Sequence, residues 1–243
     1  MSYEKSTHVC VCAELNDIEK AIEAVRCGKM ILLFDSEDRE GETDLVIPAQ
    51  TATPSDIARM RCDGGGLICV AIHATAADRL GLPFMSEILK SVSLNGHRSL
   101  ISLIEKKGDI PYDTRSSFSL WVNHRGTFTG ITDNDRALTI NKLGEIVQRV
   151  MNGENMDFGA EFRSPGHVAL LRAASGLLSE RRGQTELSIV LAMKAGITPS
   201  MVVCEMLDCK SGKALSREDA MRYSACHNLP FIEGKDILKV ACD

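Results

Sequence analysis

Short apolar runs recur along the sequence, and they are the feature that most constrains its fold. "MILLF", "LVIPA", "GGGLICVAI", "GHVALLRAA" and "SMVVCEML" are bounded by glycine or polar residues, so they predict buried strands, and the alternating "SSFSLWVNH" predicts a half-buried one. Amphipathic stretches lie between these runs, but without a steady βαβ rhythm. This order favours an α+β fold in a single domain, with a mixed sheet and helices layered as an irregular α/β sandwich.

Helix boundaries are indicated by capping residues and glycines. The stretch "LNDIEKAIEAVRCGK" predicts a helix that begins after Asn16 or Asp17 and ends at Gly28. Further helices are predicted to begin after Thr53, after Thr132 or Asp133, at "GQTELSIVLAMKAG", which ends at Gly196, and after Ser216. The pattern weakens beyond Gly81, and we expect residues 82–115 to be irregular.

Composition excludes several classes of protein. The chain has 243 residues, 44% of them hydrophobic, and no Gly/Ser/Pro-rich linker divides it. The net charge of -5 leaves no basic face for nucleic acid or anionic lipid. No signal peptide or long apolar span is evident, so we expect neither a nucleic-acid nor a membrane partner. The nine cysteines form no C-x-x-C pair, which favours a reduced, cytoplasmic location over disulfides or a zinc site.

An acidic stretch, "DSEDREGETD", lies between two predicted strands and holds six carboxylates and one arginine. One interpretation is a solvated hairpin loop. The connection is long for a hairpin, however, and Glu40, Glu42 and Asp44 share one face if the backbone is extended. Like charges on one face repel unless a cation is bound. Mg²⁺ needs only one or two protein carboxylates, and Arg39 has the planar fork that holds a phosphate or a carboxylate.

Other segments contain further candidates, each with a structural alternative. His167 follows Pro-Gly at a strand entrance, and is either structural or a general acid or base. Glu205 lies in an apolar strand, and either faces solvent or is a buried group suited to proton transfer. Cys69 is an inert buried thiol unless a neighbour activates it.

Two polar segments precede predicted helices. Arg181 and Arg182 come just before Gly183 at a helix start, where free N–H groups and the helix dipole favour an anion. The segment "TGITDNDRA", which begins at Thr129, either caps the following helix, binds a phosphate, or does both.

Together these segments resemble one family, 3,4-dihydroxy-2-butanone 4-phosphate synthase, in its archaeal-like single-domain form. The matching segments are "DSEDREGETD", "DGGGLICVAI", "DIPYDTRSSFSLWVNHR", "FTGITDNDRALTI", "FRSPGHVALLRAA", "RRGQTELS" and "VVCEM", in family order. The resemblance implies an N-terminal extension over residues 1–14 and one catalytic domain over residues 15–243. It implies a lyase of riboflavin biosynthesis that converts D-ribulose 5-phosphate to 3,4-dihydroxy-2-butanone 4-phosphate and formate. It also implies a Mg²⁺ cofactor, with Mn²⁺ as an alternative, and a homodimer with the active site at its interface.

The resemblance assigns roles by motif. The residues that it implies for catalysis are Glu205, His167, Asp35, Glu42 and Cys69. The residues that it implies for substrate binding are Arg39, Glu40, Asp44, Thr129, Arg181, Thr185 and Glu205. Glu40 is the implied metal ligand, together with the residue at position 184.

Position 184 departs from the family, which has Gly-His-Thr-Glu where this chain has "GQTE". Gln184 therefore stands in place of the metal-binding histidine. An amide oxygen is a hard donor that Mg²⁺ accepts, but an amide cannot take up a proton near neutral pH. Three interpretations follow from the sequence: an active lyase that holds metal through Gln184, a natural homologue that is inactive or weakened, and an engineered variant that binds sugar phosphate without turnover. A structural or interaction protein with a merely solvated acidic loop is a further, distant alternative.

Overall fold

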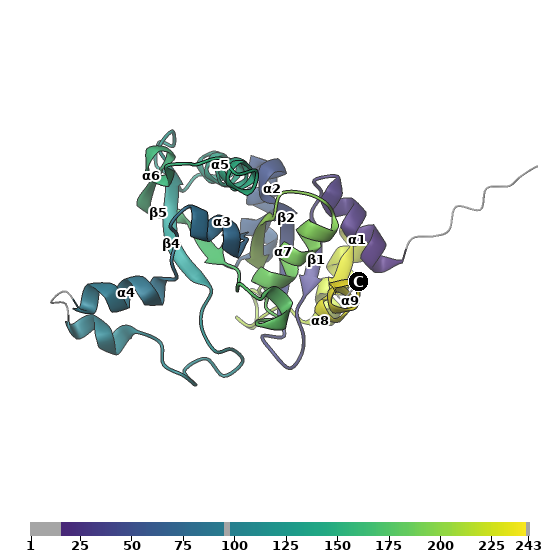
Figure 1. The fold of residues 1–243 in the computed structure, drawn as a ribbon. Coiled ribbons are helices and arrows are strands. Elements are labelled where there is room, and N and C mark those ends of the chain that lie inside the picture. The colour runs from purple at the N-terminus through teal and green to yellow at the C-terminus, as the bar shows by residue number, and fades with distance from the viewer. Residues whose placement is uncertain (1–15, 95–97, 242–243) are drawn as a thin grey trace, which may run out of the picture.

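A computed structural model describes residues 16–94 and 98–241, and its centre is one mixed sheet (Figure 1). The strand order is β4-β5-β3-β6-β2-β1-β7. β1 pairs in parallel with β7 and β3 with β5, while the other neighbours are antiparallel. The strands are β1 Ile31–Phe34, β2 Thr43–Pro48, β3 Cys69–Ile72, β4 Phe118–His124, β5 Phe162–Arg172, β6 Ser200–Glu205 and β7 Phe231–Glu233. The expected mixed sheet is confirmed.

Four of the helices begin where capping residues in the sequence predict them. The side chains of Asn16, Thr53, Thr132 and Ser216 each accept a hydrogen bond from a first-turn N–H of the helix that follows. The helices are α1 Asp17–Arg26, α2 Pro54–Arg59, α3 Ala74–Arg79, α4 Met85–Leu94, α5 Asp133–Met151, α6 Phe158–Glu161, α7 Gln184–Lys194, α8 Arg217–His227 and α9 Gly234–Ala241. Short 3₁₀ turns span Ala49–Thr51, Arg98–Leu103 and Leu177–Ser179, and a π-helical turn spans Met60–Gly64.

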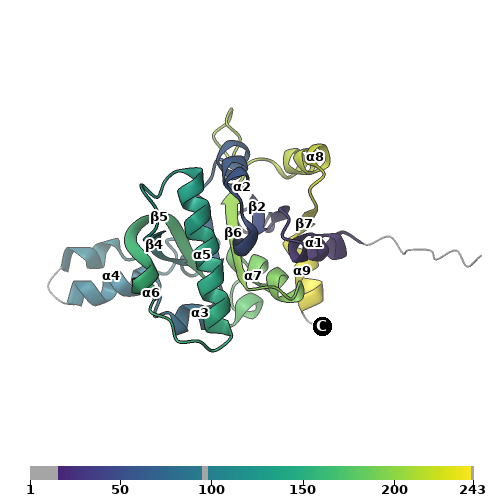
Figure 2. The ribbon, with the colours of Figure 1, turned by 90° about the horizontal axis from the view of Figure 1, so that it is seen from above.

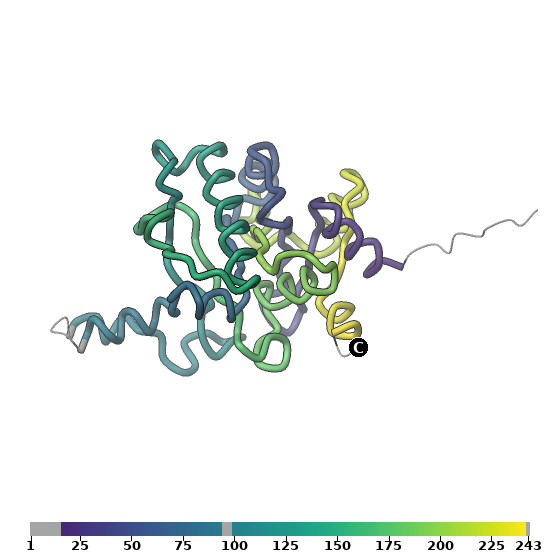
Figure 3. The backbone as a smooth tube through the Cα atoms, turned by 45° about the horizontal axis from the view of Figure 1, so that its top comes forward, coloured from purple at the N-terminus to yellow at the C-terminus, as the bar shows by residue number. Residues whose placement is uncertain are grey.

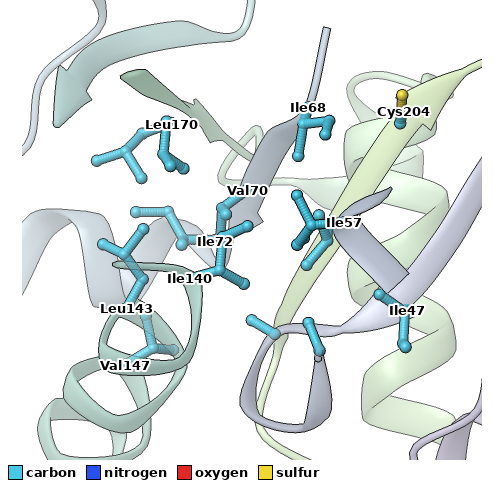
Figure 4. Close-up of a cluster of buried hydrophobic side chains, with 14 of the residues drawn as sticks. Ile47, Ile57, Ile68, Val70, Ile72, Ile140, Leu143, Val147, Leu170 and Cys204 are labelled. Carbon is cyan, nitrogen blue, oxygen red and sulfur yellow. The ribbon is translucent and has the colours of Figure 1, made fainter. Parts of the chain in front are cut away.

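The core lies on both faces of the sheet because side chains alternate along each strand. Leu32 faces a cluster built with α5, while its neighbours Ile31 and Leu33 face a cluster built with α7 and α1. Figure 2 shows α5 and α7 on opposite sides of β6. In Figure 4, side chains of α5 pack against those of β3 and β5. The layered α/β sandwich is therefore confirmed.

The expectation that residues 82–115 are irregular is wrong in part. The apolar residues Met85, Ile88, Leu89 and Val92 recur at helical spacing, and Glu87 accepts the N–H of Phe84 at the start of α4. This helix and the following 3₁₀ turn project from the body of the molecule in Figures 1 and 3. The chain then returns as a loop, residues 104–117, that leads into β4.

Further expectations from the sequence concern the N-terminal extension, the cysteines and membrane-spanning segments. The N-terminal extension, residues 1–14, lies outside them. The six cysteines in the described part of the chain are free. Across residues 16–94 and 98–241, no helix has both the length and the apolar character that a bilayer crossing requires.

Candidate active site

A polar pocket opens where β2, β6 and the beginning of α7 meet, and loop 104–117 forms its other wall. Seven of the residues singled out in the sequence line this pocket: Glu40, Asp44, Cys69, Arg181, Gln184, Thr185 and Glu205. Arg39 lies in the adjacent hollow, which shares Asp113 and Arg181 with the pocket. Segments far apart in the sequence therefore converge as their motifs suggested.

The carboxylate of Asp35 holds the acidic loop in place through hydrogen bonds. Its Oδ1 accepts the N–H of Glu42 at 3.1 Å, and its Oδ2 accepts the N–H of Glu40 at 3.1 Å and Nη1 of Arg39 at 3.2 Å. Because both oxygens already have donors, Asp35 is held in the loop and does not line the pocket. Ser36, Glu37 and Asp38 are the exposed residues of this stretch, so the interpretation as a solvated loop applies to only two of its six acids.

Asp44 and Glu205 form the acidic centre of the pocket. They are paired residues on the adjacent antiparallel strands β2 and β6. Glu205 accepts the N–H of Leu67 at 2.8 Å, and its side chain is partly buried in the pocket, which decides against a solvent-facing Glu205. Asp44 is 2% exposed and its Oδ1 has no hydrogen-bond partner. Burial, reinforced by the charge of Glu205, raises the pKa of Asp44 well above its ordinary value, which favours the protonated form of Asp44.

Cys69 contacts the same acidic centre from β3. Burial raises the pKa of its thiol well above the ordinary value, and the charges of Glu205 and Asp44 add to the effect. The thiol therefore stays protonated at neutral pH, because the neighbours oppose the thiolate rather than stabilise it. This environment favours the interpretation of Cys69 as an apolar part of the wall.

Glu40 and Glu42 flank Gly41 in the acidic stretch. Burial raises the pKa of Glu40, although Arg39, whose Nη1 lies 2.9 Å from Glu40 Oε1, opposes that shift. Burial and the charges of Glu40 and Glu205 raise the pKa of Glu42 to about 7. Turns over residues 37–40 interrupt the extended backbone, so Glu40 and Asp44 line the pocket whereas Glu42 does not.

Arg39 and Arg181 meet at one carboxylate, that of Asp113 on the loop 104–117. Asp113 Oδ2 accepts Nη2 of Arg39 at 2.7 Å and Nε of Arg181 at 2.5 Å. Burial alone would raise the pKa of Asp113, but the two arginines outweigh it and hold the pKa below its ordinary value. Arg181 Nη1 also contacts buried Glu186 at 2.6 Å. A Cβ on Gly183 would lie 2.3 Å from Arg181 Nη1 and 2.7 Å from Arg39 Nη2, so a side chain here would displace both guanidinium groups.

Gln184 is the first residue of α7 and is 6% exposed. Its Nε2 donates to the carbonyl oxygens of Leu33 at 3.1 Å and Glu42 at 3.0 Å, which fixes the orientation of the amide. Its Oε1 is buried and has no hydrogen-bond partner. A buried acceptor without a donor is costly unless another group satisfies it, and an oxygen in a pocket shared with Glu40 suits a hard cation.

The protein supplies few ligands for such a cation. Within the described residues, no group of three or more His, Cys, Asp or Glu side chains is placed to hold a metal ion. Glu40 and Gln184 together match the way Mg²⁺ binds, because that ion keeps several waters and substrate oxygens as ligands.

Thr129 and His167 lie outside the pocket, and both are exposed. The Thr129 N–H and hydroxyl donate to Asp135 Oδ2 at 3.0 and 3.2 Å, near the start of α5. The side chain of Thr132 accepts the N–H of Asp135 at 3.1 Å, so the capping interpretation of this segment is confirmed. His167 lies on β5, next to the side chain of Asn123.

Sequence reasoning missed two residues of this region, Asp113 and Asn123. Asp113 lies in "PYDTR" without the flanking pattern of a known loop, and only the fold brings it between two arginines. Asn123 interrupts the alternating run "SLWVNH" at a position that is fully buried. A buried amide in an apolar strand needs partners, and that requirement was the available signal.

Comparisons with known proteins agree with this geometry. Residues 19–240 match the family described as 3,4-dihydroxy-2-butanone 4-phosphate synthase. The chain is 56% identical to a protein of that name from Methanosarcina mazei over 97% of this chain and 95% of the relative. It is 57% identical to one from Archaeoglobus fulgidus, covering 92% and 93% of the two chains. A solved structure named as this synthase in complex with two magnesium ions is similar with a TM-score of 0.74, at 25% identity, over 92% of this chain and 95% of the other.

Proposed function

The chain belongs to the 3,4-dihydroxy-2-butanone 4-phosphate synthase family, and from this premise we propose that it converts D-ribulose 5-phosphate to 3,4-dihydroxy-2-butanone 4-phosphate and formate in riboflavin biosynthesis. The observation that carries the proposal is the convergence of seven expected residues on one pocket. Substrate and products balance without an oxidant or reductant, so the site needs acid and base groups rather than a redox partner.

The acid–base work falls to the carboxyl pair. Glu205, held by the N–H of Leu67, is placed to accept a proton from the carbon next to the substrate carbonyl. Asp44 keeps its proton through burial, so it is placed to donate to an oxygen that leaves as water or gains negative charge. Two adjacent carboxyl groups, one of them favoured in its protonated form, can supply the base and the acid that dehydration requires. Asp35, Glu42 and Cys69 remain candidates that support this pair from its surroundings.

Phosphate binding falls to Arg181, Thr185 and the beginning of α7. Gly183 caps this helix without a side-chain hydrogen bond, so its first N–H groups are open to an anion. Arg39 approaches from the acidic loop and shares Asp113 with Arg181. The guanidinium groups and the helix dipole together favour the phosphate end of a sugar phosphate over its neutral end.

We further propose that Glu40 and the Oε1 of Gln184 hold Mg²⁺, with Mn²⁺ as an alternative. The buried, unpartnered amide oxygen supports this assignment. When bound, the ion would hold sugar oxygens and stabilise negative charge on them. Binding of Mn²⁺ followed by electron paramagnetic resonance tests the assignment. Gln184→Leu should weaken binding at least about tenfold, whereas Gln184→His, which restores the residue of the family motif, should retain it. Unchanged affinity in Gln184→Leu would contradict the assignment.

The alternative of an inactive homologue or an engineered variant has no support from the comparisons. Relatives that are more than half identical over nearly their full length have the name of the synthase. The amide of Gln184 is also integrated into the fold through two backbone carbonyls.

We also propose a homodimer in which a second copy supplies Thr129 and His167 to the pocket. The support is their position outside it, beside Phe128, which is 95% exposed, and Ile131, which is 52% exposed. Large exposed apolar side chains next to site residues are typical of a surface that a partner covers. A cytoplasmic location fits the free cysteines of the described chain.

Turnover is the direct test. The chain is incubated with D-ribulose 5-phosphate and Mg²⁺, and formate is measured against a protein-free control. We expect formate production that EDTA abolishes and that Glu205→Gln lowers by about 100-fold or more, because it removes the base. A chain that binds Mn²⁺ but releases no formate would overturn the proposed function.

A further inference from the structure

Asn123 contacts both Thr129 and His167, two of the candidate site residues that lie outside the pocket. It is fully buried on β4. Its Oδ1 accepts the N–H of His167 at 2.8 Å, and its Nδ2 lies 3.1 Å from His167 Nδ1 and 3.4 Å from the carbonyl oxygen of Thr129. One amide therefore joins Thr129 to His167.

A bulge in the sheet explains why an amide is needed here. Val122 pairs with Val168 and Asn123 pairs with Arg163, so residues 164–167 leave the ladder between β4 and β5. The N–H of His167 then lacks a strand partner, and the Asn123 side chain replaces it. Bulges of this kind re-aim a side chain and are frequent beside active sites.

The surroundings pack closely around the Asn123 side chain. A Cβ on Gly130, where φ is +96°, would lie 2.0 Å from Asn123 Nδ2. A Cβ on Gly166 would lie 2.0 Å from the carbonyl carbon of Val122. The two glycines let the loops close around Asn123, so its orientation is set by packing as well as by hydrogen bonds.

This orientation decides which nitrogen of His167 carries the proton. A backbone N–H only donates, so Oδ1 must be the atom that faces it, and Nδ2 must face the ring. An amide NH₂ also only donates, so His167 Nδ1 must offer a lone pair. Oδ1 lies 3.3 Å from Nδ1 as well and has a second lone pair, so this longer contact is the one that an Nδ1–H tautomer would use. The shorter contact with Nδ2 favours a neutral ring with its proton on Nε2, the nitrogen that points away from Asn123.

We infer that Asn123 is a positioning residue that selects the tautomer of the neutral His167 ring with its proton on Nε2, so that His167 serves as a hydrogen-bond donor to a substrate oxygen rather than as a base. The inference rests on the proposed function for the placement of His167 in the site. A neutral imidazole that donates to a carbonyl or hydroxyl oxygen stabilises the negative charge that develops there. Proton removal is then left to Glu205.

The tautomer is measured directly by nitrogen NMR. The full chain is labelled with ¹⁵N-histidine, and long-range ¹H–¹⁵N spectra are recorded without ligand at a pH where the ring is neutral. His167→Gln identifies the signals. We expect the Nε2–H pattern for His167. An Nδ1–H pattern, or equal populations of both, would overturn the inference whatever the variants do.

Two variants test the role of Asn123. In Asn123→Asp the carboxylate only accepts, so the proton should move to Nδ1, and in Asn123→Ala the preference should disappear. Asn141→Ala is the matched control, because the side chain of Asn141 also bridges two backbone groups, the carbonyl oxygens of Ala49 and Ala52. It should lower stability and leave the His167 spectrum unchanged. A folded Asn123→Ala that keeps the pure Nε2–H pattern would contradict the role.

Turnover separates this inference from the proposed function. We expect Asn123→Ala to lower kcat for formate production at least about tenfold with KM changed less than about twofold, because a donor that acts on developing charge affects kcat. If the chain shows the Nε2–H pattern but produces no formate, the proposed function is overturned and the inference about the tautomer stands. If the chain produces formate but carries the His167 proton on Nδ1, the proposed function stands and the inference about the tautomer is overturned.

Discussion

Asp44 shows at the scale of one residue how the site keeps an acid protonated. It lies across the strand pair from Glu205, is fully enclosed, and has no donor on Oδ1. An ionised carboxylate without donors is far more costly inside a protein than a neutral one. The sequence suggested a patch of like charge here, but only the pairing of β2 with β6 brings the two acids together.

The first prediction concerns the stability of Asp44→Asn. The raised pKa of Asp44 means that the unfolded chain releases this proton at a lower pH than the folded chain. The free energy of unfolding of the native chain therefore falls as the pH rises above about 4, and each unit of raised pKa is worth about 1.4 kcal/mol. Asparagine does not titrate, so the variant should gain stability relative to the native chain as the pH rises.

Urea midpoints at pH 5 and pH 8 in metal-free buffer give the measurement. Asp38→Asn, on the exposed part of the same loop, is the control. The difference between its urea midpoint and that of the native chain should change less between pH 5 and pH 8 than the difference for Asp44→Asn. A difference between Asp44→Asn and the native chain that is the same at both pH values would contradict the protonated state of Asp44.

At the scale of elements, the glycines before β3 hold β6 in place. The π-helical turn ends at Gly64, and Gly65 follows with φ of +86°. Gly66 then donates its N–H to the carbonyl oxygen of Glu205 at 3.1 Å. The run "GGG" is therefore a close backbone approach that positions Glu205, in addition to an entrance to a strand.

The second prediction is that Gly66→Ala displaces Glu205. A Cβ at Gly66 would lie 2.4 Å from Glu205 Oε2 and 2.7 Å from its carbonyl oxygen. We expect a loss of about 1–3 kcal/mol in the free energy of unfolding and a loss of about 100-fold in kcat. Gly159→Ala is the control, since its Cβ would meet only Asp157 Oδ1 at 3.3 Å. Native kcat in a folded Gly66→Ala would show that Glu205 is positioned by other contacts.

Local signals explain which elements were predictable. Caps and glycines act over a few residues, so α1, α2, α5, α7 and α8 follow from the sequence. The strand β7, only three residues long, exists because it pairs with β1, and such a contact has no local signal. In the site, the pocket motifs were readable, whereas Asp113 and Asn123 act through partners that only the fold supplies.

At the scale of the whole molecule, one chain holds two separate parts of the expected site. Glu205 lies in the pocket, whereas His167 lies on β5 outside it. The apolar residues Phe128 and Ile131 stand exposed beside Thr129. These positions fit a site that is completed by a second copy, and His167 then acts on a pocket that is not its own.

The third prediction is that two inactive variants complement each other. His167→Gln and Glu205→Gln should each release little formate. If each site takes Glu205 from one chain and His167 from the other, a mixture allowed to exchange subunits should regain activity, because one kind of site in the mixed dimer is intact. The measurement is formate production before and after exchange.

The control uses the exposed phenylalanine. Phe128→Asp introduced into both variants should give monomers in sedimentation experiments and prevent the recovery, because a charge is costly in a covered apolar surface. A mixture of the two original variants that forms dimers and stays inactive would place both residues in the same site of one chain.

Asp113 gives the phosphate site a resident anion. Its carboxylate already occupies the donors of Arg39 and Arg181 that face it. A sugar phosphate that contacts Arg181 must therefore compete with a carboxylate of the protein itself, and its affinity is the difference between two anions rather than the full strength of one. Selection follows from this exchange: a doubly charged phosphate can displace a single carboxylate, while sugars and weaker anions leave Asp113 in place.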